Sequence, residues 1–139
     1  MSRKIRQTIR LKGSPRQVFE ALTDSRKTRA FTGSPAFVNK REGAQFSNYN
    51  GYCRGRNLEV VKNKLLIQAW RARDWDKGHY SIVTIRLSKT DTGTRLEFTQ
   101  ENAPAGFTKE DWTEWYWEPL KEYMKAQANK PRRRLKRAA

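Results

Sequence analysis

The chain has few of the residues that enzymes use for nucleophilic or metal chemistry. Its 139 residues include one histidine, His79, and one cysteine, Cys53. A nucleophile needs a neighbouring base, and a structural zinc site needs about four Cys or His ligands. The spacing of His79 and Cys53 gives no reason for them to meet. We therefore interpret His79 as a hairpin-end residue and Cys53 as a small strand residue, and we predict no enzyme activity, no metal and no cofactor.

Long apolar runs are also missing. No stretch approaches the roughly 18 apolar residues that a membrane-spanning helix needs. The single cysteine cannot form an intramolecular disulfide, and the first six residues are charged rather than signal-like. These features predict a cytoplasmic protein.

Acidic residues are scarce, with 14 Asp and Glu against 30 Lys and Arg and a formal net charge of +16. Six of those positive charges lie in the last ten residues, which hold no acid. We predict that residues 129–139 form a disordered basic tail. Such a tail can neutralise phosphates and bind nucleic acid non-specifically, but it has no aromatic residue for base stacking. A targeting signal or a purely solvated tail are the alternatives.

Aromatic residues, in contrast, make up 12% of the chain. Disordered chains are poor in aromatic residues, so the composition predicts a folded body with a highly charged surface. A length of 139 residues suits one domain, which we place at residues 1–128.

The hydrophobic pattern predicts a strand, two short helices, a run of strands and a long final helix. Ile5, Ile9 and Leu11 alternate with basic residues, and Gln7 interrupts this apolar side. Ser14 and Pro15 begin a helix, and a second one covers residues 26–31. Further strands are expected at residues 36–39, 44–48, 52–61, 65–73, 80–88 and 94–100, separated by turn residues.

The last helix is predicted from a cap at Thr108 to about Gln127. Its apolar stripe consists of Trp112, Trp115, Tyr116, Leu120, Tyr123 and Met124. Pro119 lies inside the helix and predicts a kink there, or a helix whose regular part starts near this residue. A sheet that curls around this helix is the simplest way to bury the stripe, so the fold class is α+β, with a curved antiparallel sheet wrapped around a C-terminal helix.

Several short segments carry a resemblance to a known family. They are Ala21-Leu22-Thr23-Asp24, residues 30–36, residues 43–46, Trp70-Arg71, Trp75, residues 78–81, residues 93–96, Trp112 and residues 116–120. In this order and spacing the chain resembles the START-like, or helix-grip, superfamily. Within it, the chain is most similar to the C-terminal domain of the activators of the 90-kDa heat-shock protein ATPase. The resemblance implies a helix-grip fold and a co-chaperone-like, non-catalytic interaction role. Asn57 departs from the pattern, since many relatives have an apolar residue there.

Two binding sites are predicted for such a domain. Aromatic residues between the sheet and the last helix are candidates to line a cavity for a small apolar ligand: Phe46, Tyr52, Trp70, Trp112, Trp115 and Tyr116. The alternative is that these rings fill a packed core. Glu59, Glu97 and Glu101 are the candidate carboxylates for the cavity, and the favoured alternative is that they face solvent or pair with an arginine.

Basic residues form the second candidate site, a surface for an acidic partner such as a chaperone ATPase. The residues are Lys4, Arg6, Arg10, Lys12, Arg54 and Arg56, with Trp75 as an exposed anchor in a loop. The alternative is a solvated basic face. The first hypothesis is thus a protein-interaction role, the second is a carrier or sensor of an apolar ligand, and the third is non-specific nucleic-acid binding.

Overall fold

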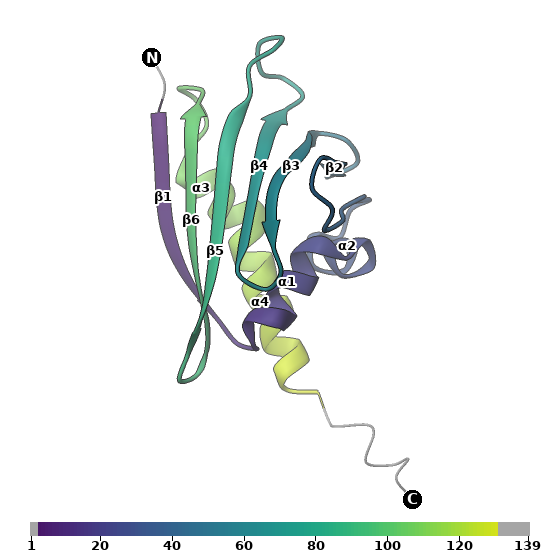
Figure 1. Cartoon of the computed structure of the whole chain (residues 1–139), viewed down its shortest axis with the longest axis vertical. Helices are drawn as coiled ribbons and strands as arrows, with labels where there is room; N and C mark the ends of the chain where they lie inside the picture. The colour runs from purple at the N-terminus through teal and green to yellow at the C-terminus, as the bar shows by residue number, and fades with distance from the viewer. Residues whose placement is uncertain (1–2, 131–139) are drawn as a thin grey trace, which may run out of the picture.

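An antiparallel sheet of six strands forms one side of the molecule (Figure 1). The computed structural model describes residues 3–130. Its strands are β1 (Arg3–Leu11), β2 (Gln45–Asn48), β3 (Cys53–Val61), β4 (Leu65–Ala72), β5 (Ser81–Thr90) and β6 (Gly93–Ala103). All six were expected within a few residues. The strand predicted at residues 36–39 is wrong, because Phe37 makes only an isolated bridge with Ser47.

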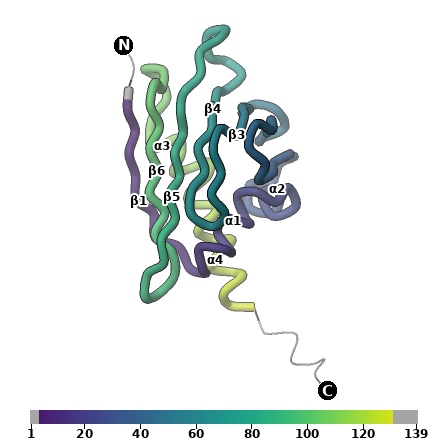
Figure 2. The backbone as a smooth tube through the Cα atoms, in the orientation of Figure 1, coloured from purple at the N-terminus to yellow at the C-terminus, as the bar shows by residue number. Residues whose placement is uncertain are grey.

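Strands β2 to β6 follow one another in space as they do in sequence, whereas β1 lies at the far edge beside β6. The spatial order is β1-β6-β5-β4-β3-β2, so the strands that come first and last along the chain, β1 and β6, are neighbours (Figure 2). This pairing brings β1 next to the strand that leads into the C-terminal helix.

Helices α1 (Pro15–Thr23) and α2 (Ser25–Thr32) follow β1 as predicted. Ser14 caps α1 through a capping box with Gln17, which satisfies two backbone N–H groups at the helix start. The side chain of Asp24 accepts from the first backbone N–H groups of α2, and Gly33 ends α2 in the left-handed conformation.

The C-terminal helix is interrupted by a π-helical turn. It consists of α3 (Lys109–Trp112), the π-helical turn η1 (Thr113–Trp117) and α4 (Glu118–Ala128). Pro119 lacks the N–H that would normally bond to the carbonyl of Trp115, four residues earlier. The wider π turn precedes the proline, and the hydroxyl of Tyr49 donates to the Trp115 carbonyl instead. The predicted irregularity near Pro119 is therefore a π turn with a replacement donor.

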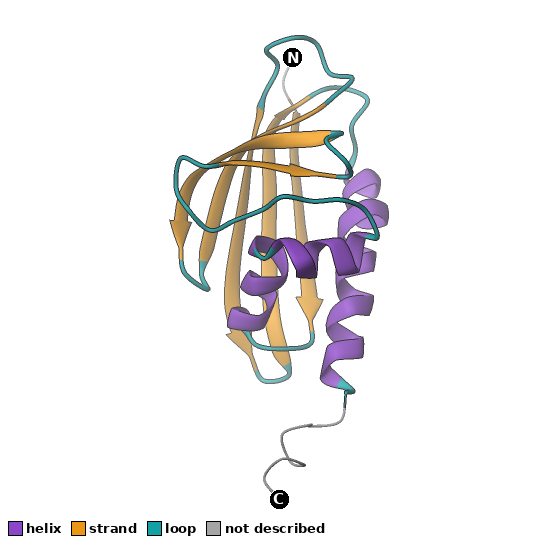
Figure 3. Ribbon diagram, turned by 90° about the vertical axis from the view of Figure 1, so that its right-hand side faces the viewer, coloured by secondary structure: helices purple, strands orange, loops and turns teal. Residues whose placement is uncertain are grey.

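The helices lie on the concave face of the sheet, as Figure 3 shows. The core fills the space between them, and its largest fully buried side chains include Trp70, Trp117, Phe19 and Phe98. Trp117 was missing from the predicted stripe because the extra residue of the π turn rotates it inward, while Trp115 is 52% exposed. The predicted fold class, a curved sheet that grips a long C-terminal helix, is confirmed.

Asn57, the departure noted in the sequence, lies at a bulge of β3 and is fully buried. Its amide nitrogen donates to Asn39 and to the carbonyl oxygen of Arg41, at 3.0 Å each, and its oxygen accepts from Gln68 at 3.0 Å. Asn57 thus fixes the loop that precedes β2, which explains a polar residue at this position.

The domain boundary at residue 128 stays a prediction. Most of the predicted basic tail, residues 131–139, lies outside the described residues. Within residues 3–130, no helix is long and apolar enough to cross a membrane.

Candidate functional site: an aromatic cavity under the C-terminal helix

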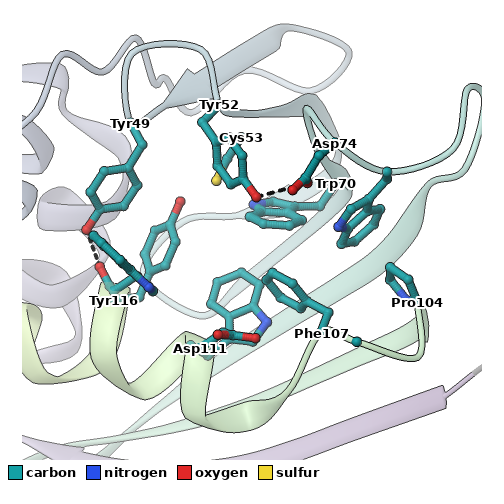
Figure 4. A pocket seen from close by; sticks show the side chains of 13 residues that line it. Tyr49, Tyr52, Cys53, Trp70, Asp74, Pro104, Phe107, Asp111 and Tyr116 are labelled. Atoms are coloured by element: carbon teal, nitrogen blue, oxygen red, sulfur yellow. Dashed lines mark hydrogen bonds between the residues drawn. The ribbon is translucent and has the colours of Figure 1, made fainter.

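A cavity of about 640 Å³ lies between the sheet and the start of the C-terminal helix. Eight aromatic side chains contribute to its wall, as the close view in Figure 4 shows. The lining residues are Tyr49, Tyr52, Cys53, Trp70, Asp74, Trp75, Pro104, Gly106, Phe107, Asp111, Trp112, Trp115 and Tyr116. A volume of this size is typical of small-molecule sites. The hollow is partly open to solvent, and Trp70, Trp112 and Tyr116 at its wall also belong to the packed core.

Rings from three separate segments meet at the base of the cavity. Trp70 comes from β4, Phe107 from the loop before α3, and Trp112 from α3. The centroid of the Trp70 ring lies 4.9 Å from that of Trp112 and 5.6 Å from that of Phe107. Trp75, in the loop after β4, packs on Trp70 at 5.5 Å. These tilted contacts are favourable arrangements for aromatic pairs and fix the shape of the wall.

A buried hydrogen-bond chain holds Trp112 against the sheet. Its indole Nε1 donates to Gln100 Oε1 (2.8 Å), and Gln100 Nε2 donates to Ser81 Oγ (2.9 Å). Ser81 Oγ donates in turn to the carbonyl oxygen of Trp70 (2.9 Å). Gln100 and Ser81 are fully buried. The chain therefore joins α3 to three strand positions and satisfies each buried polar group along it.

A second glutamine makes the same kind of connection on β1. Gln7 Oε1 accepts from the indole Nε1 of Trp117 (3.0 Å), and Gln7 Nε2 donates to Thr113 Oγ1 (2.9 Å). The polar residue that interrupts the apolar side of β1 is thus a contact to the π turn. Gln7 and Gln100 together position the helical segment that forms the cavity wall.

The ionisable hydroxyl and thiol groups of the wall are held neutral. Burial, with a further contribution from nearby negative charge, raises the pKa of Cys53, Tyr49 and Tyr52 to about 12 each. Burial also raises the pKa of Tyr116 well above its usual value. The Tyr116 hydroxyl lies beside the Cys53 thiol, and among the described residues it has no hydrogen-bond partner of good geometry. A buried thiol with so high a pKa is a poor nucleophile.

Most of the predicted cavity residues do meet. Tyr52, Trp70, Trp112, Trp115 and Tyr116 line the cavity, whereas Phe46 does not. Phe46 is buried beneath β2, where its ring lies against Gly55 and borders a shallower hollow.

The candidate carboxylates Glu59, Glu97 and Glu101 do not line the cavity. They are exposed on the outward face of the sheet, which is the favoured alternative. The cavity instead takes its carboxylates from Asp74 and Asp111. Sequence reasoning missed both because one is in a loop and the other forms a capping box with Thr108, a role that usually places a side chain at the surface.

His79 lies in the loop between β4 and β5, where its Nε2 donates to the carbonyl oxygen of Asn102 (2.8 Å). Its ring also packs on Trp75, with 5.3 Å between centroids. Trp75 is therefore half-buried at the cavity, and its role as a partner anchor stays a prediction.

The basic candidates lie on or beside the outward face of the sheet. Lys4, Arg6, Arg10, Arg54 and Arg56 are all exposed, and the strand registers place them on the same face. Lys12, also exposed, follows the end of β1.

Two of these side chains have partners of their own. Lys4 makes an exposed ion pair with Glu101 (3.5 Å), and Arg56 donates to the Gly43 carbonyl oxygen (2.6 Å). Arg6, Arg10 and Arg54 make no ion pair within the described residues. These three guanidinium groups are therefore available for an external contact.

The six-stranded sheet, the two short helices after β1 and the gripped C-terminal helix define a START-like, helix-grip domain. A family model described as "Activator of Hsp90 ATPase homolog 1-like protein" matches residues 12–125. The chain belongs to this family.

Individual relatives agree with this assignment. The chain is 26% identical over 112 residues to the human activator of 90 kDa heat shock protein ATPase homolog 1, an alignment that covers 78% of this chain and 33% of that protein. The corresponding Dictyostelium discoideum homologue is 34% identical over 92 residues, with 66% of this chain and 24% of that protein covered. The chain thus spans about a third or less of the length of these relatives.

Solved structures show the same fold. A crystal structure of an HSP90 activator from Plasmodium falciparum superposes with a TM-score of 0.73 at 28% identity, covering 94% of this chain and 98% of that one. A protein from Rhizobium leguminosarum superposes with a TM-score of 0.75 at 15% identity, covering 91% and 96%, and supports the fold alone.

Proposed function

We propose that this domain is a co-chaperone module that binds a 90-kDa heat-shock protein ATPase through the outward face of its sheet. Membership of the activator family supports the choice of partner. The domain then acts by binding one conformational state of the ATPase more tightly than another, without covalent chemistry of its own. This role places the protein in the cytoplasm together with the chaperone.

The main support for this surface is a set of exposed arginines on the outward face of the sheet that form no ion pair within the described residues. Arg6, Arg10 and Arg54 are exposed there, and Ile82, 38% exposed, adds an apolar contact on the same face. Arginine beside apolar surface is enriched in protein interfaces, and its charge steers an acidic partner into contact.

The test compares two triple variants that remove the same total charge. Arg6→Gln/Arg10→Gln/Arg54→Gln removes three charges from the sheet face. The control, with Gln at Lys109, Lys121 and Lys125, removes three from exposed positions on the helices. Binding to a purified 90-kDa chaperone is measured by calorimetry at low and high salt, alongside the chaperone's ATPase rate.

The proposal predicts a roughly tenfold loss of affinity for the sheet variant and less than about a twofold loss for the helix variant, since exposed charges each contribute about 0.2–1 kcal/mol. High salt should weaken binding of the unaltered chain. Equal losses in both variants, or no binding by the unaltered chain, would contradict the proposed surface.

A second candidate function is supported by the cavity. Its volume of about 640 Å³ and its aromatic wall suit a small molecule with a large apolar part. We propose that the domain also carries or senses such a ligand between the sheet and the C-terminal helix. Native mass spectrometry of the purified chain tests this role: a retained mass that is lost on denaturation supports it.

A further inference from the structure

The charged groups of the cavity are all of one sign. Among the described lining residues, only Asp74 and Asp111 carry a charge, and both are carboxylates. Neither forms an ion pair within residues 3–130, although the chain has 30 Lys and Arg against 14 Asp and Glu. Asp74 is exposed and Asp111 is half-buried, so the cavity carries negative charge on the side that is open to solvent, without a basic partner.

Both carboxylates are held in place at the wall. Asp74 accepts from the Tyr52 hydroxyl (2.9 Å), and Asp111 accepts from the backbone N–H of Thr108 (2.9 Å). Figure 4 shows Asp74 and Asp111 entering the site from different segments, one from the strand side and one from the helix side. Each carboxylate retains acceptor capacity, since an ionised carboxylate offers about four lone-pair positions.

The rest of the wall is suited to a cation as well. Eight aromatic rings surround the space, and Trp70, Trp75, Trp112 and Trp115 are among them. Aromatic faces attract ammonium groups electrostatically, indole most strongly, and the attraction grows when water is excluded. Neutral aliphatic ligands would gain nothing from the two carboxylates and would have to tolerate their desolvation.

The Tyr116 hydroxyl is a further polar group at the wall. It is buried beside the Cys53 thiol and the Asn48 side chain, without a hydrogen bond of good geometry among the described residues. It carries no charge and contributes nothing to a preference for a cation.

Two guanidinium groups lie close to the cavity but bind backbone carbonyl oxygens. Arg71 donates to the Trp75 carbonyl oxygen at 2.9 Å. Arg73 lies over the Tyr52 ring at 5.9 Å and donates to the Asn50 carbonyl oxygen. Neither forms an ion pair with the two carboxylates of the cavity.

We infer that the cavity binds an organic ammonium ion that carries an apolar tail. The aromatic faces and the carboxylates of Asp74 and Asp111 hold the ammonium group, and the remaining apolar wall takes the tail. This inference rests on the proposed ligand-binding role of the cavity and adds the charge of the ligand to it.

The experiment uses three probes with the same ten-carbon tail and different head groups: decyltrimethylammonium, 1-decanol and decanoate. Four of the chain's five tryptophans line the cavity, so tryptophan fluorescence reports binding. The expected order is the cation roughly tenfold tighter than the alcohol, with decanoate weakest. This order opposes the protein's net charge of +16, which favours the anion at any non-specific site.

A double variant then assigns the preference to the carboxylates. Asp74→Asn/Asp111→Asn is nearly isosteric, and the new amide oxygen at residue 111 can still accept from Thr108. It should lose most of the cation's advantage over the alcohol and keep only the part that the aromatic faces supply. The control is Asp91→Asn, in the exposed turn between β5 and β6. It removes a carboxylate that does not line the cavity, so the preference for the cation should remain.

The outcomes separate the inference from the role on which it rests. Equal affinity for the cation and the alcohol, or tighter binding of decanoate, would overturn the cation preference and leave ligand binding intact. Failure of all three probes to bind would overturn both. The probe comparison needs only the unaltered chain, so it decides the question even if the double variant does not fold.

Discussion

Replacing Gln100 with leucine tests how the cavity wall is held. In the structure Gln100 is fully buried, accepts from the Trp112 indole and donates to Ser81. Gln100→Leu keeps the approximate volume but leaves the Trp112 N–H buried without a partner. An orphaned buried donor costs about 1–3 kcal/mol, and the lost bond to Ser81 adds about 1 kcal/mol. We expect the free energy of unfolding to fall by about 2–4 kcal/mol.

A double-mutant cycle isolates the hydrogen bond from the change in packing. Trp112→Phe removes the indole donor, so in the double variant Gln100→Leu/Trp112→Phe no orphaned N–H remains. The double variant should therefore be less destabilised than the sum of the single variants by about 1–2 kcal/mol. Urea unfolding followed by fluorescence, with unchanged dependence on denaturant, provides the measurement.

Gln45→Leu serves as the control for this cycle, because Gln45 is an exposed strand residue. Its free energy of unfolding should change by no more than about 0.5 kcal/mol. Additivity of Gln100→Leu and Trp112→Phe within about 0.5 kcal/mol would refute the reasoning, since the two side chains would then be independent.

Three further predictions concern other parts of the site. Gly55→Ala should lower the free energy of unfolding by about 3 kcal/mol in a denaturant titration, because a Cβ would lie 1.8 Å from a carbonyl oxygen of β4; unchanged stability would contradict this close packing. Tyr49→Phe should cost about 1–3 kcal/mol in the same titration, since the Trp115 carbonyl freed by the proline loses its donor; a neutral effect would mean that water replaces the hydroxyl. The folded state holds Cys53, Tyr49 and Tyr52 protonated up to a pKa of about 12, against 9.0 for an ordinary thiol and 10.0 for a phenol. Their contribution to stability is therefore complete below pH 9.0 and is lost between pH 9.0 and about 12. Unfolding curves across that range check this, and constant stability would argue against burial.

Local patterns predicted much of the fold. The alternation of Ile5, Ile9 and Leu11 and the Ser14 capping box specified elements that depend on nearby residues alone. The pairing of β1 with β6 did not follow from any local pattern, because it joins segments about ninety residues apart. The structure alone supplied this pairing.

The polar anchors show where sequence reasoning stopped. Gln7 and Asn57 were noticed as polar residues where apolar ones are expected. Their hydrogen-bond partners lie on distant segments, and a local sequence pattern does not show which distant segments are neighbours in space. Asp111 lies in the first turn of α3, where it bonds to Thr108, and the same residue also lines the cavity. When a side chain has one contact nearby in the sequence and another on a distant segment, the sequence reveals only the nearby contact.

Hydrogen exchange of the tryptophan indole N–H groups, measured by NMR, tests most directly whether the sheet grips the C-terminal segment. The Trp112 and Trp117 N–H groups donate to buried Gln100 and to Gln7, whereas Trp115 is 52% exposed. The indole protons of Trp112 and Trp117 should exchange at least about a hundredfold more slowly than that of Trp115, since exchange requires the helix to leave the sheet. Equally fast exchange at all three positions would contradict the packing on which the cavity and both proposed binding roles depend.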